Sequence, residues 1–159
     1  MDRLNSVMVR LSFVWLLVGV VVGGVMLIDR ALPGQWRLWL QPSHVHMLVV
    51  GWFLQFALGI AYWLLPRKRT PTQPLGYDER LAFTAVAALN LGLILRVIGE
   101  TTERAGHESD VTLAMLSVSA VLQIAAIATF VVQLWPRVQI RSRAKANVGG
   151  GAAKQQEKA

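Results

Sequence analysis

Two histidines, separated by a single residue, are the side chains of this chain best suited to chemistry. His44 and His46 directly precede an apolar run that ends at Pro66. A polar ligand-type side chain at membrane depth is costly, so by default it marks a site for a metal, haem or proton. The chain has three histidines and no cysteine. Thiolate metal sites, iron–sulfur clusters and covalently attached c-type haem are therefore excluded.

Haem is the cofactor that best suits one or two neutral imidazoles among apolar helices, because its iron takes axial histidine nitrogens. On an α-helix His44 and His46 lie about 200° apart, so they cannot face the same partner helix. The side of His44 is small and polar enough for a packed interior, and it continues through Leu48, Gly51, Gln55, Gly59 and Tyr62. Helical geometry favours His44 as the interior ligand and leaves His46 open as the alternative.

Arg96 is the cation expected to neutralise haem propionates, because it lies near the end of an apolar run. The simpler alternative is that its side chain reaches the membrane interface and pairs with Glu100, four residues further on. A different site would use His44, His46 and His107, with acids such as Glu103 or Glu108, to bind copper or zinc, since imidazole and carboxylate suit both ions.

Four apolar stretches must position these residues, at about 11–28, 46–65, 81–98 and 111–135. Each has the roughly 18–25 residues that a helix needs to cross a bilayer. In lipid the backbone must satisfy its own hydrogen bonds, so these stretches are expected to be helices. The sequence predicts an all-α integral membrane protein, a four-transmembrane-helix bundle over residues 1–145, with Asp110 capping the last helix. Residues 146–159 are expected to form a disordered basic cytoplasmic tail.

The distribution of the net charge of +7 along the chain indicates which loops lie in the cytoplasm. Basic residues precede the first stretch, follow the second and follow the fourth, whereas the third loop is acidic. The positive-inside rule then places both termini in the cytoplasm, with all three histidines on the outer side. We expect a bacterial-type inner membrane, contact with anionic lipid and no nucleic acid partner. The same scheme puts Trp15 at the cytoplasmic boundary as an anchor.

A family resemblance rests on residues 42–66. His44-Val45-His46 followed by Gly51-Trp52, then by Gly59, Tyr62 and Leu64-Leu65-Pro66, resembles the second helix of subunit I of the haem–copper oxidases and nitric oxide reductases. The resemblance implies that a histidine at the outer end of this helix is an axial ligand of a low-spin haem b. That subunit has about twelve helices and further histidines, so this chain is not expected to be a complete oxidase or reductase.

The sequence therefore favours a haem b-binding subunit that supports electron transfer in a larger membrane redox complex, and it assigns no catalytic residue. The second axial ligand would come from a partner subunit, a second copy of the chain or His107. Two alternatives stay open: a structural scaffolding subunit without a cofactor, and the outer-face copper or zinc protein.

Overall fold

The computed structural model describes residues 2–67, 71 and 73–156, with side chains as far as residue 138. All regular elements of this part of the chain are helices. They are α1 (Arg3–Leu27), η1 (Asp29–Ala31), α2 (Trp36–His46), η2 (Met47–Leu54), α3 (Gln55–Leu64), α4 (Glu79–Arg104) and α5 (Asp110–Gln156). Four helical spans are long and apolar enough to cross a membrane: Arg3–Leu27, Trp36–Leu64, Glu79–Arg104 and Asp110–Val138.

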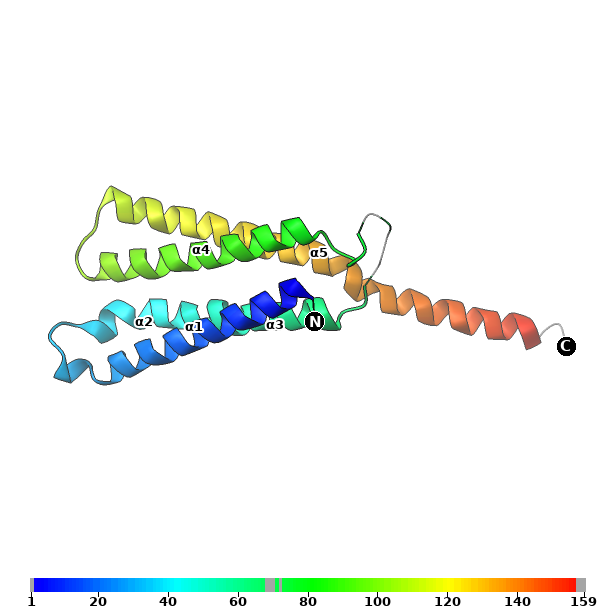
Figure 1. Cartoon of the computed structure of the whole chain (residues 1–159), viewed down its shortest axis with the longest axis horizontal. Helices are drawn as coiled ribbons and strands as arrows, with labels where there is room; N and C mark the ends of the chain where they lie inside the picture. The colour runs from blue at the N-terminus through cyan, green and yellow to red at the C-terminus, as the bar shows by residue number, and fades with distance from the viewer. Residues whose placement is uncertain (1, 68–70, 72, 157–159) are drawn as a thin grey trace.

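The spans form two antiparallel hairpins that lie side by side (Figure 1). The first hairpin consists of α1 with the continuous α2–η2–α3 helix, and the second consists of α4 with the first part of α5. We call the end that carries the start of α2 and the α4–α5 turn the histidine end, and the opposite end the terminal end. The hairpins meet at the histidine end through α2 and α4, where the Ser43 hydroxyl lies 3.4 Å from the Val97 carbonyl and 3.3 Å from the Thr101 hydroxyl.

The helices extend beyond the apolar stretches that predict them, because polar residues complete their ends. α1 begins at Arg3 rather than near residue 11, and α2 begins at Trp36 rather than near residue 46. At the start of α4, the Asp78 carboxylate accepts from the Leu81 N–H at 3.0 Å. The cap of α5 differs from the predicted Asp110: the Ser109 hydroxyl accepts from the Thr112 N–H at 3.2 Å. Hydropathy locates the apolar middle of each helix, whereas the capping bonds mark the starts of α4 and α5.

The helix that carries the histidines contains a π-helical segment, η2, over Met47–Leu54. Its buried positions recur every four residues and then three: Ser43, Met47, Gly51, Gln55, Gly59 and Tyr62. A regular α-helix would rotate such a four-residue stripe away from the partner helix by about 40° at each step. The wider π turns counteract that drift. The expected stripe is confirmed from Gly51 onward, but it begins at Ser43 and Met47 rather than at His44 and Leu48.

The fourth span continues beyond Pro136 as one helix to Gln156. It includes residues 146–156, which are expected to be a disordered tail, and the remaining residues 157–159 of that tail lie outside the described residues. Alanine, lysine and glutamine are strong helix formers, which favours this continuation, although the glycines at 149–151 oppose it.

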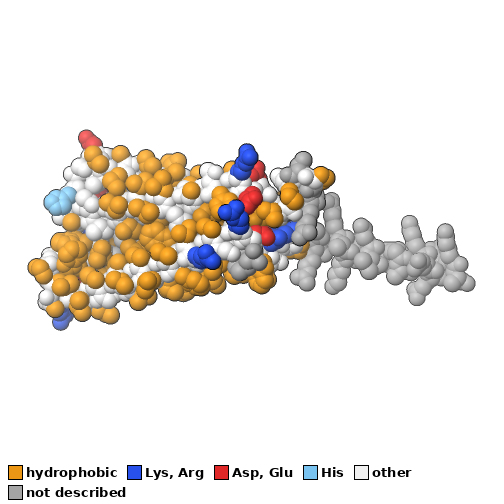
Figure 2. Space-filling model, in the orientation of Figure 1, with side chains coloured by type: hydrophobic (Ala, Val, Ile, Leu, Met, Phe, Trp, Pro, Cys, Tyr) orange, Lys and Arg blue, Asp and Glu red, His pale blue; other side chains and the backbone are white. Residues whose placement is uncertain are grey.

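The core lies between the hairpins and is densest toward the terminal end, where Leu4, Met8, Tyr62, Leu89 and Phe130 are fully enclosed. Much of the outer surface is apolar. Figure 2 shows hydrophobic side chains over the length of the bundle, with charged groups gathered near its two ends. Exposed apolar side chains include Leu17 on α1 and Ile124 on α5, 67% and 71% exposed. Exposed apolar area on this scale is unusual for a soluble monomer.

Candidate functional site

His44 lies against α1. Its Nδ1 is 2.9 Å from the Gly19 carbonyl oxygen. A Cβ built on Gly23 would come within 3.0 Å of the His44 Cε1, so the ring occupies the space that this glycine leaves. Because a carbonyl can only accept, Nδ1 carries a proton, and in the neutral ring the lone pair is on Nε2. Gly19 and Gly23 thus make room for the helix that carries His44, whereas nothing packs against Gly24.

His46 lies on the other side of the helix, toward α4. Its Nδ1 is 2.9 Å from the Pro42 carbonyl oxygen and 3.8 Å from Oε2 of Glu100. The two imidazoles therefore face different partner helices, as their helical spacing predicts. The Glu100 carboxylate beside His46 in turn pairs with the Arg96 guanidinium, so the surroundings of His46 are partly charged.

Arg96 pairs with Glu100. Its Nη2 is 2.8 Å from the Glu100 Oε1, one helical turn along α4. The position of Arg96 therefore fits the simpler prediction, in which it pairs with Glu100. Two buried atoms of the pair, Nε of Arg96 and Oε2 of Glu100, have no hydrogen-bond partner in the described chain. The histidine end thus holds a cluster of one imidazole, one guanidinium and one carboxylate between α2 and α4.

His107 stands apart in the turn after α4 and is exposed. Within the described part of the chain, no three histidine, aspartate or glutamate side chains come together as a group that could hold a metal ion. The proposed copper or zinc set of His44, His46 and His107 is therefore not assembled, because His44 faces α1 and His46 faces α4.

A polar network in the middle of the bundle was not predicted from the sequence. Trp15 donates from Nε1 to the Asn90 Oδ1 at 2.8 Å, and Asn90 donates from Nδ2 to the Gln55 Oε1 at 3.0 Å. Gln55, fully enclosed, donates in turn to the Met8 carbonyl at 3.2 Å. Trp15, which the sequence predicts as a boundary anchor, is thus half-buried and hydrogen-bonded to a side chain of α4. The only sequence signal was the presence of an amide in each of two apolar stretches.

A second unpredicted cluster surrounds Arg137 at the terminal end. The sequence presents Arg137 as one of several basic residues after an apolar stretch, yet it is only 1% exposed. It donates from Nη2 to the carbonyls of Tyr62 and Leu65, at 3.0 and 2.8 Å, and from Nε to that of Pro66, at 3.1 Å. Its Cζ lies 5.6 Å from the Tyr62 ring centroid and 5.9 Å from that of Tyr77. A side chain of α5 therefore caps the end of α3.

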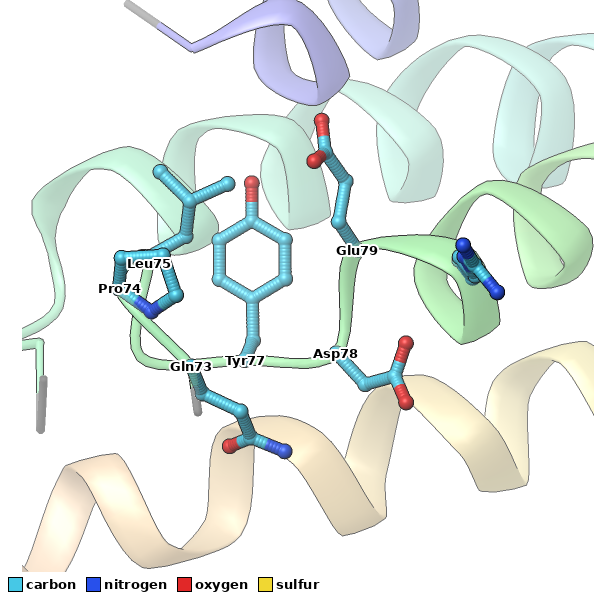
Figure 3. Close-up of a pocket in the computed structure, with 7 residues that line it drawn as sticks. Gln73, Pro74, Leu75, Tyr77, Asp78 and Glu79 are labelled. Carbon is cyan, nitrogen blue, oxygen red and sulfur yellow. The ribbon is translucent and has the colours of Figure 1, made fainter. Parts of the chain in front are cut away.

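The α3–α4 connection carries Tyr77 into this cluster. Figure 3 shows Tyr77 and Glu79 pointing to one side of the connection, while Gln73 and Asp78 point toward α5 on the other. These residues, with Pro74, Leu75 and Arg80, line a cavity of about 330 Å³. Burial raises the pKa of the Tyr77 phenol, and the nearby carboxylates of Asp2 and Glu79 raise it further. The phenol is therefore a neutral hydrogen-bonding group.

Comparison with known proteins adds no family assignment: no family model, curated protein or solved structure matches the chain.

Proposed function

We propose that this chain is a multi-pass membrane protein that binds a b-type haem through His44, as one subunit of a larger membrane redox complex. In this proposal the four spans cross a bacterial-type inner membrane, both termini are cytoplasmic and the histidine end faces outward. The chain supports electron transfer and does not by itself catalyse a reaction.

Membrane insertion is supported by the distribution of side chains. The four spans are each 25 to 29 residues long, which is enough to cross the roughly 30 Å hydrocarbon layer. Their outward sides are largely apolar, and the charges gather toward the ends of the bundle (Figure 2). The basic connection between α3 and α4 favours the cytoplasm for the terminal end.

The observation that carries the haem proposal is the bond from the His44 Nδ1–H to the Gly19 carbonyl, 2.9 Å long. A metal-ligating histidine usually donates its other ring N–H to a carbonyl or carboxylate, which fixes the tautomer and the ring orientation. His44 meets that requirement and presents Nε2 as the ligand nitrogen. His46 also has its Nδ1 tied to a carbonyl, but the Glu100–Arg96 pair beside it makes its surroundings more polar.

Each residue has a limited role in this proposal. His44 would hold the haem iron, and a second copy or a partner subunit would supply the further ligand, because His46 faces away and His107 lies in an exposed turn. Arg96 would neutralise propionate charge only by sharing its guanidinium with Glu100. The haem, when bound, would accept and release single electrons.

The test is an absorption spectrum of the detergent-purified chain with its native partners, oxidised and dithionite-reduced, together with a pyridine haemochrome assay. The informative variant is His44→Asn, whose amide Nδ2 takes the place of the imidazole Nδ1 and keeps a donor for Gly19. It should abolish the b-type spectrum while the complex still assembles, whereas His107→Ala should leave both the spectrum and the assembly unchanged. The absence of a Soret band in the wild-type complex would refute the proposal, and loss of the spectrum only in His46→Ala would transfer the ligand role to His46.

A structural scaffolding subunit is the second candidate, and one observation favours it. Both helix imidazoles already bond to backbone carbonyls, and the His44 ring fills the space left by Gly23. Both histidines would then serve helix packing alone. This reading predicts no haem in the purified complex, a lower Tm in His44→Ala and normal assembly of His44→Asn.

A further inference from the structure

The turn between α1 and α2, at the histidine end, is a fixed structure that holds two tryptophans. We call residues 27–39 the tip of the first hairpin. Gly34 has φ 110°, and a Cβ built on it would come within 3.0 Å of the Trp39 ring, so this ring packs directly on the glycine. Trp36 donates from Nε1 to the Pro33 carbonyl at 2.8 Å, and the two indole rings meet edge to face at 5.3 Å. Both indoles therefore have defined positions at this end of the hairpin.

The tip exposes large apolar side chains together with two arginines. Its exposed apolar side chains are Leu27, Ile28 and Leu38, which are 88%, 55% and 51% exposed. Arg30 and Arg37 are exposed as well, whereas the acidic Asp29 accepts the Arg37 backbone N–H at 3.0 Å through Oδ1. Indole rings prefer the boundary between hydrocarbon and headgroups, and guanidinium groups bind phosphate oxygens. A phospholipid surface would cover the apolar side chains and pair with the arginines, whereas water would leave the apolar area hydrated.

Contacts along the hairpin fix the level of the tip. A Cβ on Gly23 of α1 would meet the His44 ring of α2 at 3.0 Å, so these two residues lie opposite each other. The helices are antiparallel, so five residues further along α1 and five residues back along α2 reach the same level, which pairs Ile28 with Trp39. At a rise of about 1.5 Å per residue, this level lies about 8 Å beyond His44. The apolar side chains and the indoles of the tip thus form one layer.

The length of α1 indicates where this layer falls in a bilayer. Arg10 is exposed at the start of the apolar part of α1, and Ile28 follows 18 residues later, about 27 Å further along the helix. That separation is close to the hydrocarbon thickness of about 30 Å. If the Asp2–Arg67 ion pair marked the inner edge instead, about 30 Å of helix would end near residue 22, and the layer would stand about 9 Å outside the hydrocarbon. The exposed apolar side chains and the indoles favour the first placement.

We propose that the tip of the first hairpin is a lipid anchor, which lies at the boundary between the hydrocarbon and the headgroups of the outer leaflet. Its exposed apolar side chains enter the acyl chains, and its arginines bind lipid phosphates. The hydrocarbon then begins at the level of Trp39 rather than near residue 46, where the predicted apolar stretch begins. His44 lies about 8 Å inside the hydrocarbon. This inference rests on the membrane insertion of the proposed function, but not on haem.

Single cysteines test the position of the tip, because the chain has no cysteine of its own. Leu38→Cys marks the tip at an exposed position, and His107→Cys in the exposed α4–α5 turn is the matched control at the same end. The full-length variants are reconstituted in vesicles of phosphatidylcholine and phosphatidylglycerol and treated with a membrane-impermeant maleimide. We expect labelling of Leu38→Cys to be at least about tenfold slower than that of His107→Cys, because a thiol in apolar surroundings stays protonated and unreactive. Equal rates would place the tip in water and would overturn the proposal.

Quenching by spin-labelled lipids distinguishes lipid from protein as the cover of the tip. A fluorophore attached to Leu38→Cys should be quenched more strongly by a lipid labelled at the headgroup than by one labelled near the end of an acyl chain. Quenching by neither lipid would show that protein covers the tip, and stronger quenching by the deep label would place it in the bilayer interior. Either result contradicts the anchor. Resistance to alkaline carbonate extraction is checked first, because a chain that is extracted fails the membrane insertion itself rather than the anchor.

Discussion

Because Arg137 caps the end of α3, we predict that its removal lowers the free energy of unfolding by an amount that can be worked out from its hydrogen bonds. Arg137→Met keeps most of the apolar stem and removes the guanidinium. The carbonyls of Tyr62, Leu65 and Pro66 then lose their donor, since the last carbonyls of a helix have no partner within it.

The size of the effect follows from the burial of these atoms. The Tyr62 carbonyl bond is buried, and losing its donor costs about 1–3 kcal/mol. The bonds to Leu65 and Pro66 are part-buried, so each adds less. Removing a buried cation also recovers part of its desolvation penalty, which works in the opposite direction. We expect a net loss of about 3 kcal/mol, which lowers Tm by about 6–12 °C in a chain of this size.

Thermal unfolding in detergent, followed by the fluorescence of the six tryptophans, is the assay. Arg80→Met removes an exposed arginine of α4 and serves as the matched control, with no expected shift. Arg137→Lys keeps the charge but loses the planar fork of donors, so its Tm should be intermediate. A Tm for Arg137→Met equal to or above that of the wild type would show that desolvation outweighs the three hydrogen bonds and would refute this reasoning.

Three further predictions concern other parts of the bundle. Gly24→Ala should raise Tm, because alanine favours a helix by about 1 kcal/mol and nothing lies within 4 Å of the new Cβ. Gly23→Ala should raise Tm less, or lower it, because its Cβ meets the His44 ring at 3.0 Å. Equal shifts of Tm in the two variants would contradict the packing of His44. Trp15→Phe should destabilise the chain by about 1 kcal/mol through the lost bond to Asn90, while Trp63→Phe, on an exposed indole, should be neutral; denaturant titration of both variants measures the difference. Because burial raises the pKa of the Tyr77 phenol above its usual 10.0, the contribution of Tyr77 to stability should be fully present below pH 10 and should be lost as the pH rises through the folded-state value. Tyr77→Phe should flatten that fall, and an identical slope in both proteins would argue against the burial.

The long apolar runs were sufficient to predict the helices, because crossing a bilayer requires both length and apolar composition. In the α2–η2–α3 helix, the buried side from Gly51 onward was also predictable, because Gly51, Gln55, Gly59 and Tyr62 follow a helical repeat and are all buried. The buried side before Gly51 was not, because nothing in the composition of residues 47–54 signals the π turns that shift the buried stripe to Ser43.

The polar interior was less accessible from the sequence because its partners are far apart along the chain. Trp15 and Asn90 are separated by 75 positions, and the local pattern of Trp15 is that of an interfacial anchor. Arg137 belongs to a run of basic residues that, in the sequence, indicates only which end of the helix is cytoplasmic. In the structure, its guanidinium lies against two tyrosine rings. This environment arises only when the two hairpins pack together, so the local sequence does not distinguish Arg137 from the neighbouring basic residues. The divergence of His44 and His46, by contrast, was predictable from their spacing alone.

The π segment also accommodates one residue more than a regular α-helix would place between the histidines and the amide network. The buried positions Ser43, Met47, Gly51 and Gln55 lie four residues apart and on one side, so this stretch makes about three full turns. Regular α turns of about 100° per residue over the same stretch would rotate Ser43 by about 120° relative to Gln55. With one residue of Met47–Leu54 deleted, regular α turns would restore the alignment to within about 20°. A single deletion can therefore remove the π segment and leave both imidazoles on their present sides of the bundle.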